Sequence, residues 1–188
     1  MYSATQKRMR QHIISKMLEL LNEKQFNVIT IQMICERAEI NRSTFYRYFE
    51  DKYDLLYYVS LEISERLGHY AHSEAQRPFF YSMLNFMAEH KKLFKNIMTT
   101  DNRVDIFGDL VQLVSRMMRD DVQQNVKNKD PITCQIRKAQ HPVVISDFYS
   151  SGLIEVLKRW LENDYPIDVE EMAASLEIIF KVDSGKNQ

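Results

Sequence analysis

Apolar residues recur at three- and four-residue intervals along most of this chain, which is the spacing of one face of an α-helix. The alternation expected of a half-buried strand is scarce. Only four glycines occur, and their scattered positions exclude a glycine-rich phosphate loop; they are Gly68, Gly108, Gly152 and Gly185. The pattern predicts an all-α fold, and the missing loops argue against nucleotide chemistry.

Three short helices are predicted in the first fifty residues, over 5–21, 31–38 and 42–48. Thr30 and Asn41 stand where the second and third would need an N-cap, and both residue types favour that position. Asp51 is expected to cap a fourth, longer helix. On the first helix, Lys7, Arg8 and Arg10 are expected on the open side.

Further helices are predicted over 78–98, 104–120, 133–140, 142–162 and 169–182. Pro142 suits the first turn of a helix, and Asp168 is a suitable N-cap for the last one. Residues 121–131 have the composition of a loop, residues 163–166 that of a turn, and the tail is expected to fray.

Composition limits the class of protein. Hydrophobic residues make up 45% of the chain and charged residues 27%, which is globular rather than disordered. The net charge is −1, yet residues 1–52 hold nine basic against six acidic residues, a weak footprint for phosphate. Cys35 and Cys134 form no disulfide framework, and Cys35 is expected to be a small buried hydrophobe. Without a signal-peptide or membrane-span pattern, we expect a cytoplasmic protein with no membrane partner.

The second and third helices, separated by a tight turn, form the pattern of a helix-turn-helix. On the third, Phe45 and Phe49 lie four residues apart and can face the core, whereas Ser43, Tyr46 and Arg47 lie on the opposite side. Exposed aromatic and cationic groups on a short helix indicate a binding surface. The major groove of DNA admits such a helix, and arginine can bond guanine with two hydrogen bonds.

The segment TIQMICERAEINRSTFYRYFEDKYDLL, from Thr30 to Leu56, closely resembles the DNA-binding segment of the TetR family of bacterial regulators. Its most specific part is TFYRYF at 44–49, followed by Lys52. Residues 150–161 also resemble a C-terminal domain of Gram-positive members. The resemblance implies a three-helix DNA-binding domain over 1–50, a connecting helix over 51–72, and a helical dimerisation and ligand-binding domain over 73–188. It implies a transcriptional regulator, most commonly a repressor released by a small effector.

The resemblance also implies roles for individual residues. Contacts to backbone phosphates would come from Thr30, Thr44, Tyr46, Tyr48 and Lys52, the last beside a helix N-terminus. Base edges would be read by Gln32, Arg42, Ser43 and Arg47. The alternative is structural: Thr30 as a cap alone, and the two tyrosines packed at the domain surface. Glu39 stands where the family usually has glycine, and a left-handed backbone there would cost about 1 kcal/mol.

A regulator of this kind reads a near-palindromic operator in double-stranded DNA as a homodimer, with half-sites about 34–36 Å apart. The last two long helices carry apolar stripes that could pair with their symmetry mates in a four-helix interface. The alternative is that both stripes pack inside the monomer. The predicted dimer residues are Phe148, Gly152, Leu153, Val156, Trp160, Met172, Leu176 and Ile179.

Between these stripes and the DNA-binding segment, the chain is rich in methionine and phenylalanine. Methionine adapts to varied apolar ligands, although an ordinary core has the same composition. The resemblance favours a pocket for a small apolar effector, lined by Phe79, Met83, Phe86, Met87, Phe94, Phe107 and Met118.

Parts of the sequence are also compatible with two other classes of function. His69 and His72 lie three apart and could share a metal ion with Glu62 or Glu65, but a solvated helical face has the same pattern. No serine or cysteine has the sequence setting of a nucleophile, so neither an enzyme nor a cofactor is expected. The remaining alternative is a co-regulator of the same fold that acts mainly through protein partners, without a small-molecule ligand.

Overall fold

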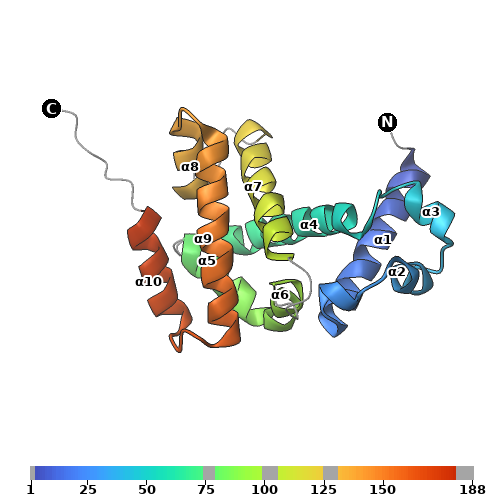
Figure 1. The fold of residues 1–188 in the computed structure, drawn as a ribbon, viewed down its shortest axis with the longest axis horizontal. Helices are drawn as coiled ribbons and strands as arrows, with labels where there is room; N and C mark the ends of the chain where they lie inside the picture. Colours follow the sequence, from blue (N-terminus) through green and yellow to red (C-terminus); the bar gives the residue numbers. More distant parts are fainter. Residues whose placement is uncertain (1–2, 74–78, 99–105, 125–130, 181–188) are drawn as a thin grey trace. The chain divides into compact units, whose positions relative to one another are not determined.

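A computed structural model describes residues 3–73, 79–98, 106–124 and 131–180, and in these ranges the chain is helical with no strand (Figure 1). The predicted all-α fold is confirmed. The elements are α1 (Ala4–Glu23), η1 (Phe26–Val28), α2 (Ile31–Arg37), α3 (Arg42–Tyr46), α4 (Lys52–Ser73), α5 (Phe79–Glu89), α6 (Lys91–Met98), α7 (Ile106–Gln124), α8 (Pro131–Lys138), α9 (Pro142–Glu162) and α10 (Val169–Phe180).

Side-chain caps define where the N-terminal helices begin. The hydroxyl of Thr30 accepts a hydrogen bond from the Met33 amide at 3.2 Å, and the Asn41 side chain accepts one from the Thr44 amide at 2.8 Å. Both predicted caps are confirmed. Asp51 accepts from the amide of Asp54 at 2.8 Å in the same way. These caps satisfy amides that a helix leaves without intrahelical partners.

The chain divides into two compact units. The first comprises Met1–Arg66 and Lys91–Val104, and the second comprises Leu67–His90 and Asp105–Gln188. This division differs from the expected 1–50, 51–72 and 73–188. It splits α4 between the units and groups α6 with the N-terminal helices, because α6 packs on α1.

In the first unit, α1 packs against α2 and α6, and α2 packs against α3. The Asn96 amide on α6 donates to the Leu21 carbonyl at the end of α1, at 2.8 Å. The core consists of side chains with no exposed surface, which are Ile13, Met17, Leu21, Phe26, Ile29, Ile34, Phe45, Leu55 and Val59. Cys35 is 5% exposed, as expected of a small buried hydrophobe.

In the second unit, α7, α8 and α9 pack against one another, and α10 packs on α5 (Figure 1). A polar cluster joins α7 to α9: Arg119 donates to the buried Ser146 hydroxyl at 3.1 Å and lies 3.4 Å from an Asp147 oxygen. None of the described helices is both long and apolar enough to cross a membrane.

Several boundaries differ from the predictions. The single helix expected over 78–98 is interrupted at His90, so α5 and α6 are separate helices. Within the segment 121–131, which was expected to be a loop, α7 continues to Gln124 and α8 begins at Pro131; proline favours the first helical turn. The helix expected over 42–48 is α3, which ends at Tyr46, two residues earlier than expected.

Candidate nucleic-acid interface

The short helix α3 has one buried and one exposed side. Phe45 and Phe49 are 0% and 2% exposed, with ring centroids 5.7 Å apart. Arg42, Ser43, Tyr46 and Arg47 are exposed. The buried aromatics anchor the helix to the core of the first unit, so its polar and cationic side chains remain available to a ligand, as the sequence pattern predicted.

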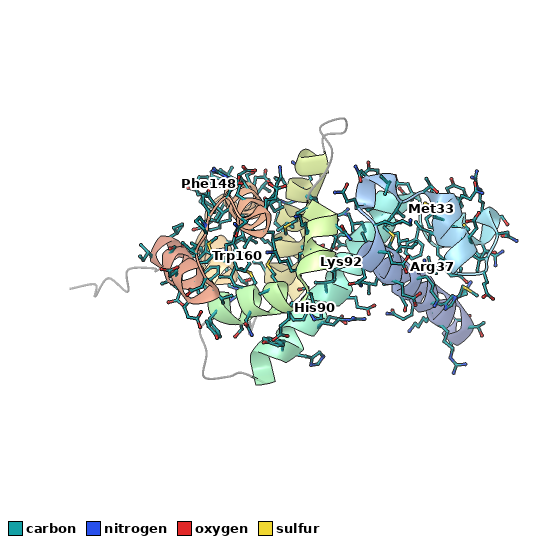
Figure 2. The ribbon with its side chains drawn as sticks, turned by 90° about the horizontal axis from the view of Figure 1, so that it is seen from below. Met33, Arg37, His90, Lys92, Phe148 and Trp160 are labelled. Atoms are coloured by element: carbon teal, nitrogen blue, oxygen red, sulfur yellow. The ribbon has the colours of Figure 1, made fainter. Side chains whose placement is uncertain are left out.

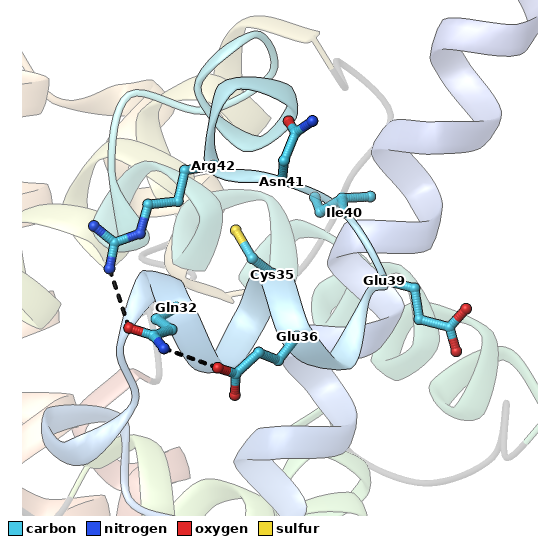
Figure 3. Close-up of a pocket in the computed structure, with 7 residues that line it drawn as sticks. All are labelled: Gln32, Cys35, Glu36, Glu39, Ile40, Asn41 and Arg42. Carbon is cyan, nitrogen blue, oxygen red and sulfur yellow. Dashed lines mark hydrogen bonds between the residues drawn. The ribbon is translucent and has the colours of Figure 1, made fainter.

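A groove of about 520 Å³ lies where α2 and α3 meet (Figure 3). Three of its lining side chains form a chain of hydrogen bonds. The Arg42 guanidinium donates to Gln32 Oε1 at 3.3 Å, and Gln32 Nε2 donates to Glu36 Oε1 at 2.9 Å. Two predicted base readers, Gln32 and Arg42, are therefore brought into direct contact.

The hydroxyl-bearing candidates differ in what their hydroxyls already do. Thr30 is exposed, and its oxygen only accepts in the cap, so its proton is available to a phosphate. Ser43 instead donates its proton to the Asn41 side chain at 2.7 Å. Reading a base as a donor would require Ser43 to give up that bond. Thr44 is half-buried on the same helix.

The two candidate tyrosines have different environments. Tyr46 is 55% exposed, and its ring packs edge-on against Phe45 at 5.5 Å. Tyr48 lies beyond the end of α3 and is only 9% exposed. Little of Tyr48 is available to DNA, and its location matches the packing alternative better than the phosphate role.

The contacts that Lys52 makes in the structure differ from the phosphate contact implied by the resemblance. Its ammonium donates to three carbonyl oxygens, those of Phe26, Asn27 and Ile29, at 3.1, 3.2 and 2.9 Å. An ammonium has three donors, so all are engaged. The nitrogen also lies 4.6 Å from the centroid of the Phe26 ring, and burial lowers the pKa of Lys52. Lys52 thus fastens η1 to the start of α4.

Arg10 corrects a second expectation. Its guanidinium carbon lies 3.6 Å from the centre of the Tyr58 ring and 5.7 Å from that of Phe49, so the side chain stacks between α1 and α4 and is half-buried. Lys7 and Arg8 are exposed, as expected. The helical period places Arg10 near Lys7 and Arg8, but stacking on the Tyr58 ring of α4 determines where its side chain points.

Glu39, at the turn between α2 and α3, has a φ of 54°, in the left-handed region. The turn therefore keeps the backbone conformation that suits glycine, although the residue is glutamate. Its side chain is exposed and lines the groove together with Glu36, so two acids border this face.

Replacing Glu39 by glycine should raise the free energy of unfolding by about 1 kcal/mol, because glycine adopts a positive φ without steric cost. Denaturant unfolding of the purified protein measures this change. Glu39→Ala is the matched control, since it removes the same charge but keeps the Cβ atom. Equal stabilisation by both variants would mean that charge, not backbone strain, determines the cost.

The predicted effector-pocket residues do not form one described cluster. Met83, Phe86 and Met87 on α5 are at most 8% exposed, and Met118 on α7 is half-buried. Phe94 lies on α6, which belongs to the first unit, whereas α5 and α7 belong to the second. The side chains of Phe79 and Phe107 lie outside the described part of the structure.

The predicted dimer residues fall into three groups. Phe148 on α9, labelled in Figure 2, is 70% exposed. Ile179 on α10 is 63% exposed, and Gly152 is also exposed. Val156 and Trp160 are half-buried, and the Trp160 indole donates to the Ile167 carbonyl at 3.1 Å. Three others are buried within the protomer, because α9 and α10 use one face to cover their own unit; they are Leu153, Met172 and Leu176.

Among the described side chains, no three histidine, cysteine or acidic groups are placed to hold a metal ion. His69 is exposed on α4, and the side chain of His72 lies outside the described set.

Comparison with known proteins yields two family matches. Residues 13–59 match the family described as bacterial regulatory proteins, tetR family. Residues 74–182, more than half of the chain, match the one described as transcriptional regulator C-terminal region. An alignment 106 positions long, which covers 51% of this chain, is 27% identical to the uncharacterized HTH-type transcriptional regulator YxbF of Bacillus subtilis (strain 168). The match spans only 28% of that protein's length.

Proposed function

This chain belongs to the TetR family of bacterial transcriptional regulators, and from that premise we propose that it represses transcription as a homodimer bound to a near-palindromic operator. The single observation that carries the proposal is the geometry of α3. Its aromatic side is anchored in the core, while Arg42, Tyr46 and Arg47 are exposed. A helix held this way can enter the major groove without rearranging its own unit.

Operator selection from random or genomic fragments tests this function. We expect a site with two half-sites about one helical turn apart, and an affinity that falls linearly with salt on logarithmic axes. Arg47→Ala should weaken binding and lower the salt slope by about one if its charge lies at a phosphate, or relax one base preference if it reads an edge.

Lys138→Ala is the matched control, because it removes the same charge from an exposed position on α8 in the second unit. Its salt slope should equal that of the wild type. If the folded wild-type dimer selects no site above background, direct DNA recognition is refuted, and the co-regulator that acts through protein partners becomes the better assignment.

The exposed apolar residues of α9 and α10 support the homodimer. Besides Phe148 and Ile179, they include Val143, Val144 and Ile178, which are 54%, 63% and 72% exposed. Gly152 adds to the argument, since a Cβ atom built there would meet nothing within 4 Å in the protomer. Glycine weakens a helix interior by about 0.5–1 kcal/mol relative to alanine, and close approach of a second copy would account for it.

A small apolar effector is the second part of the proposal, and a buried polar atom supports it. The Ser82 hydroxyl on α5 is in a residue 1% exposed and has no hydrogen-bond partner among the described residues. A buried polar group normally has a hydrogen-bond partner. Met83 and Phe86, two of the predicted pocket residues, follow Ser82 on the same helix. A mostly apolar ligand with one polar atom would satisfy it.

Thermal-shift screening of apolar compounds, followed by operator titration, tests the effector. A true effector raises the melting temperature and weakens operator binding, because it must bind the DNA-free state more tightly than the DNA-bound state. Ser82→Ala should reduce the melting shift for that compound. A compound that binds tightly but leaves operator affinity unchanged is not an effector.

A further inference from the structure

The groove between α2 and α3 contains a hydrogen-bonded chain whose polarity is set by charge. The Glu36 carboxylate can only accept, and the Arg42 guanidinium can only donate. The Gln32 amide between them must therefore present its NH₂ group to Glu36 and its oxygen to Arg42 (Figure 3). The opposite amide orientation would place donor against donor and acceptor against acceptor.

Both ends of the Gln32 amide are thus engaged. A glutamine that reads adenine uses its oxygen and its NH₂ group together on one base edge. Gln32 could do so only by releasing Arg42 at 3.3 Å and Glu36 at 2.9 Å. Arg42 is less committed, because this contact uses one of its five donors. Two parallel donors for a guanine remain.

From this geometry we propose that Gln32 is a positioning residue that sets base preference through Arg42, and that Glu36 holds the Gln32 amide in the required orientation. The proposal rests on the proposed DNA-binding function and goes further, because it assigns the reading of one base pair to Arg42 alone. Glu36 lies one helical turn from Gln32 on α2, where residues four apart are neighbours. Arg42, the first residue of α3, is thereby oriented by two residues of α2, Gln32 and Glu36.

A double-mutant cycle tests the assignment. Gln32→Ala, Arg42→Ala and the double variant are titrated with the selected operator and with operators substituted at each base pair. Arg42→Ala should lose about 5- to 150-fold discrimination at one base pair, the range for a bidentate contact. Gln32→Ala should lose about two- to tenfold at that same base pair, the effect of one hydrogen bond. In the Arg42→Ala background, Gln32→Ala should change nothing further.

Matched variants separate positioning from structural damage. Glu36→Gln still accepts from the Gln32 amide and should keep the wild-type base preference, whereas Glu36→Ala should behave like Gln32→Ala. Gln32→Ala combined with Arg47→Ala should be additive, because the hydrogen bonds that link Arg42, Gln32 and Glu36 do not involve Arg47. Melting temperatures should be equal across the set, since the side chains of Gln32, Glu36, Arg42 and Arg47 are all exposed.

Two results would overturn the inference. Gln32→Ala could alter preference at a base pair different from that of Arg42→Ala, or keep its full effect when Arg42 is absent. Either result would make Gln32 a direct reader. Failure of the proposed function is a distinct outcome, since the wild-type protein would then select no site, and both the function and this inference would fall.

Discussion

Replacing Phe148 by glutamate is expected to convert the proposed homodimer to monomers and to reduce operator affinity by about 100- to 10,000-fold. Phe148 is 70% exposed in the protomer, and its described ring contact is with its neighbour Tyr149, at 5.8 Å between centroids, so the substitution removes little packing within the chain. In a dimer it would place a carboxylate in an apolar interface, where an unpaired charge is costly. The affinity range is the gain that linking two binding modules supplies without any new contact.

Analytical ultracentrifugation and operator titration, performed on the same samples, measure the two effects. Gln112→Glu is the matched control, because it introduces the same charge at an exposed position on α7. The melting temperature of dilute Phe148→Glu protein reports whether the protomer still folds. If Phe148→Glu stays dimeric with unchanged operator affinity, α9 does not form the dimer contact.

Gly152→Leu provides an independent check on the same face. The space around its Cβ position is open within the protomer, so the variant should fold at least as well as the wild type. If a second copy approaches Gly152 closely, the larger side chain will weaken the dimer. A Gly152→Leu protein with wild-type dimer affinity would place the interface elsewhere on α9 and α10.

Lys52→Ala is expected to lower the free energy of unfolding by about 2–4 kcal/mol. Three carbonyl oxygens lose their donor, and a hydrogen bond to a charged group contributes about 1.5–3 kcal/mol net. The total loss stays below the sum of three such bonds because Lys52 is only half-buried, so water can reach the carbonyls once the ammonium is gone. The contact with the Phe26 ring is lost as well. Denaturant unfolding of the full chain measures the change.

Two further variants isolate the cause. Lys52→Met keeps an apolar chain of similar length but supplies no donor, and it should be nearly as destabilised as Lys52→Ala. Lys16 is the control, a half-buried lysine in the same unit that pairs with Glu19 at 2.7 Å on one helix. Such pairs contribute little, so Lys16→Ala should lower stability far less. Equal losses for Lys16→Ala and Lys52→Ala would contradict the role assigned to Lys52.

The salt dependence of operator binding distinguishes the carbonyl contacts from the phosphate contact implied by the family resemblance. Under conditions where Lys52→Met is folded, it should bind the operator with the wild-type salt slope. The reason is that the ammonium of wild-type Lys52 already uses its three donors and has none left for DNA. A slope lower by about one would show that Lys52 contacts a phosphate in the complex, and the three carbonyl bonds would then belong to the free protein alone.

Local patterns predicted the helices because helix formation depends on neighbours in the sequence. In the described part of the chain, the 3.6-residue period located each helix to within a few residues, except that the single helix expected over 78–98 proved to be the two helices α5 and α6. Capping is equally local, since Thr30 and Asn41 each bond an amide three residues ahead. The burial of Phe45 and Phe49 followed from their four-residue spacing, and the recognition segment was identified from residue types alone.

Tertiary structure decided what each side chain contacts, because those contacts join residues far apart in the sequence. Lys52 bonds carbonyls 23 to 26 residues away, and Arg10 stacks on Tyr58. Periodicity shows which residues share a helical face but not which face another helix covers. It could not separate the exposed Phe148 from the buried Leu176, and it could not show that Gln32 bonds Arg42 across the turn. Those assignments depend on how the helices pack.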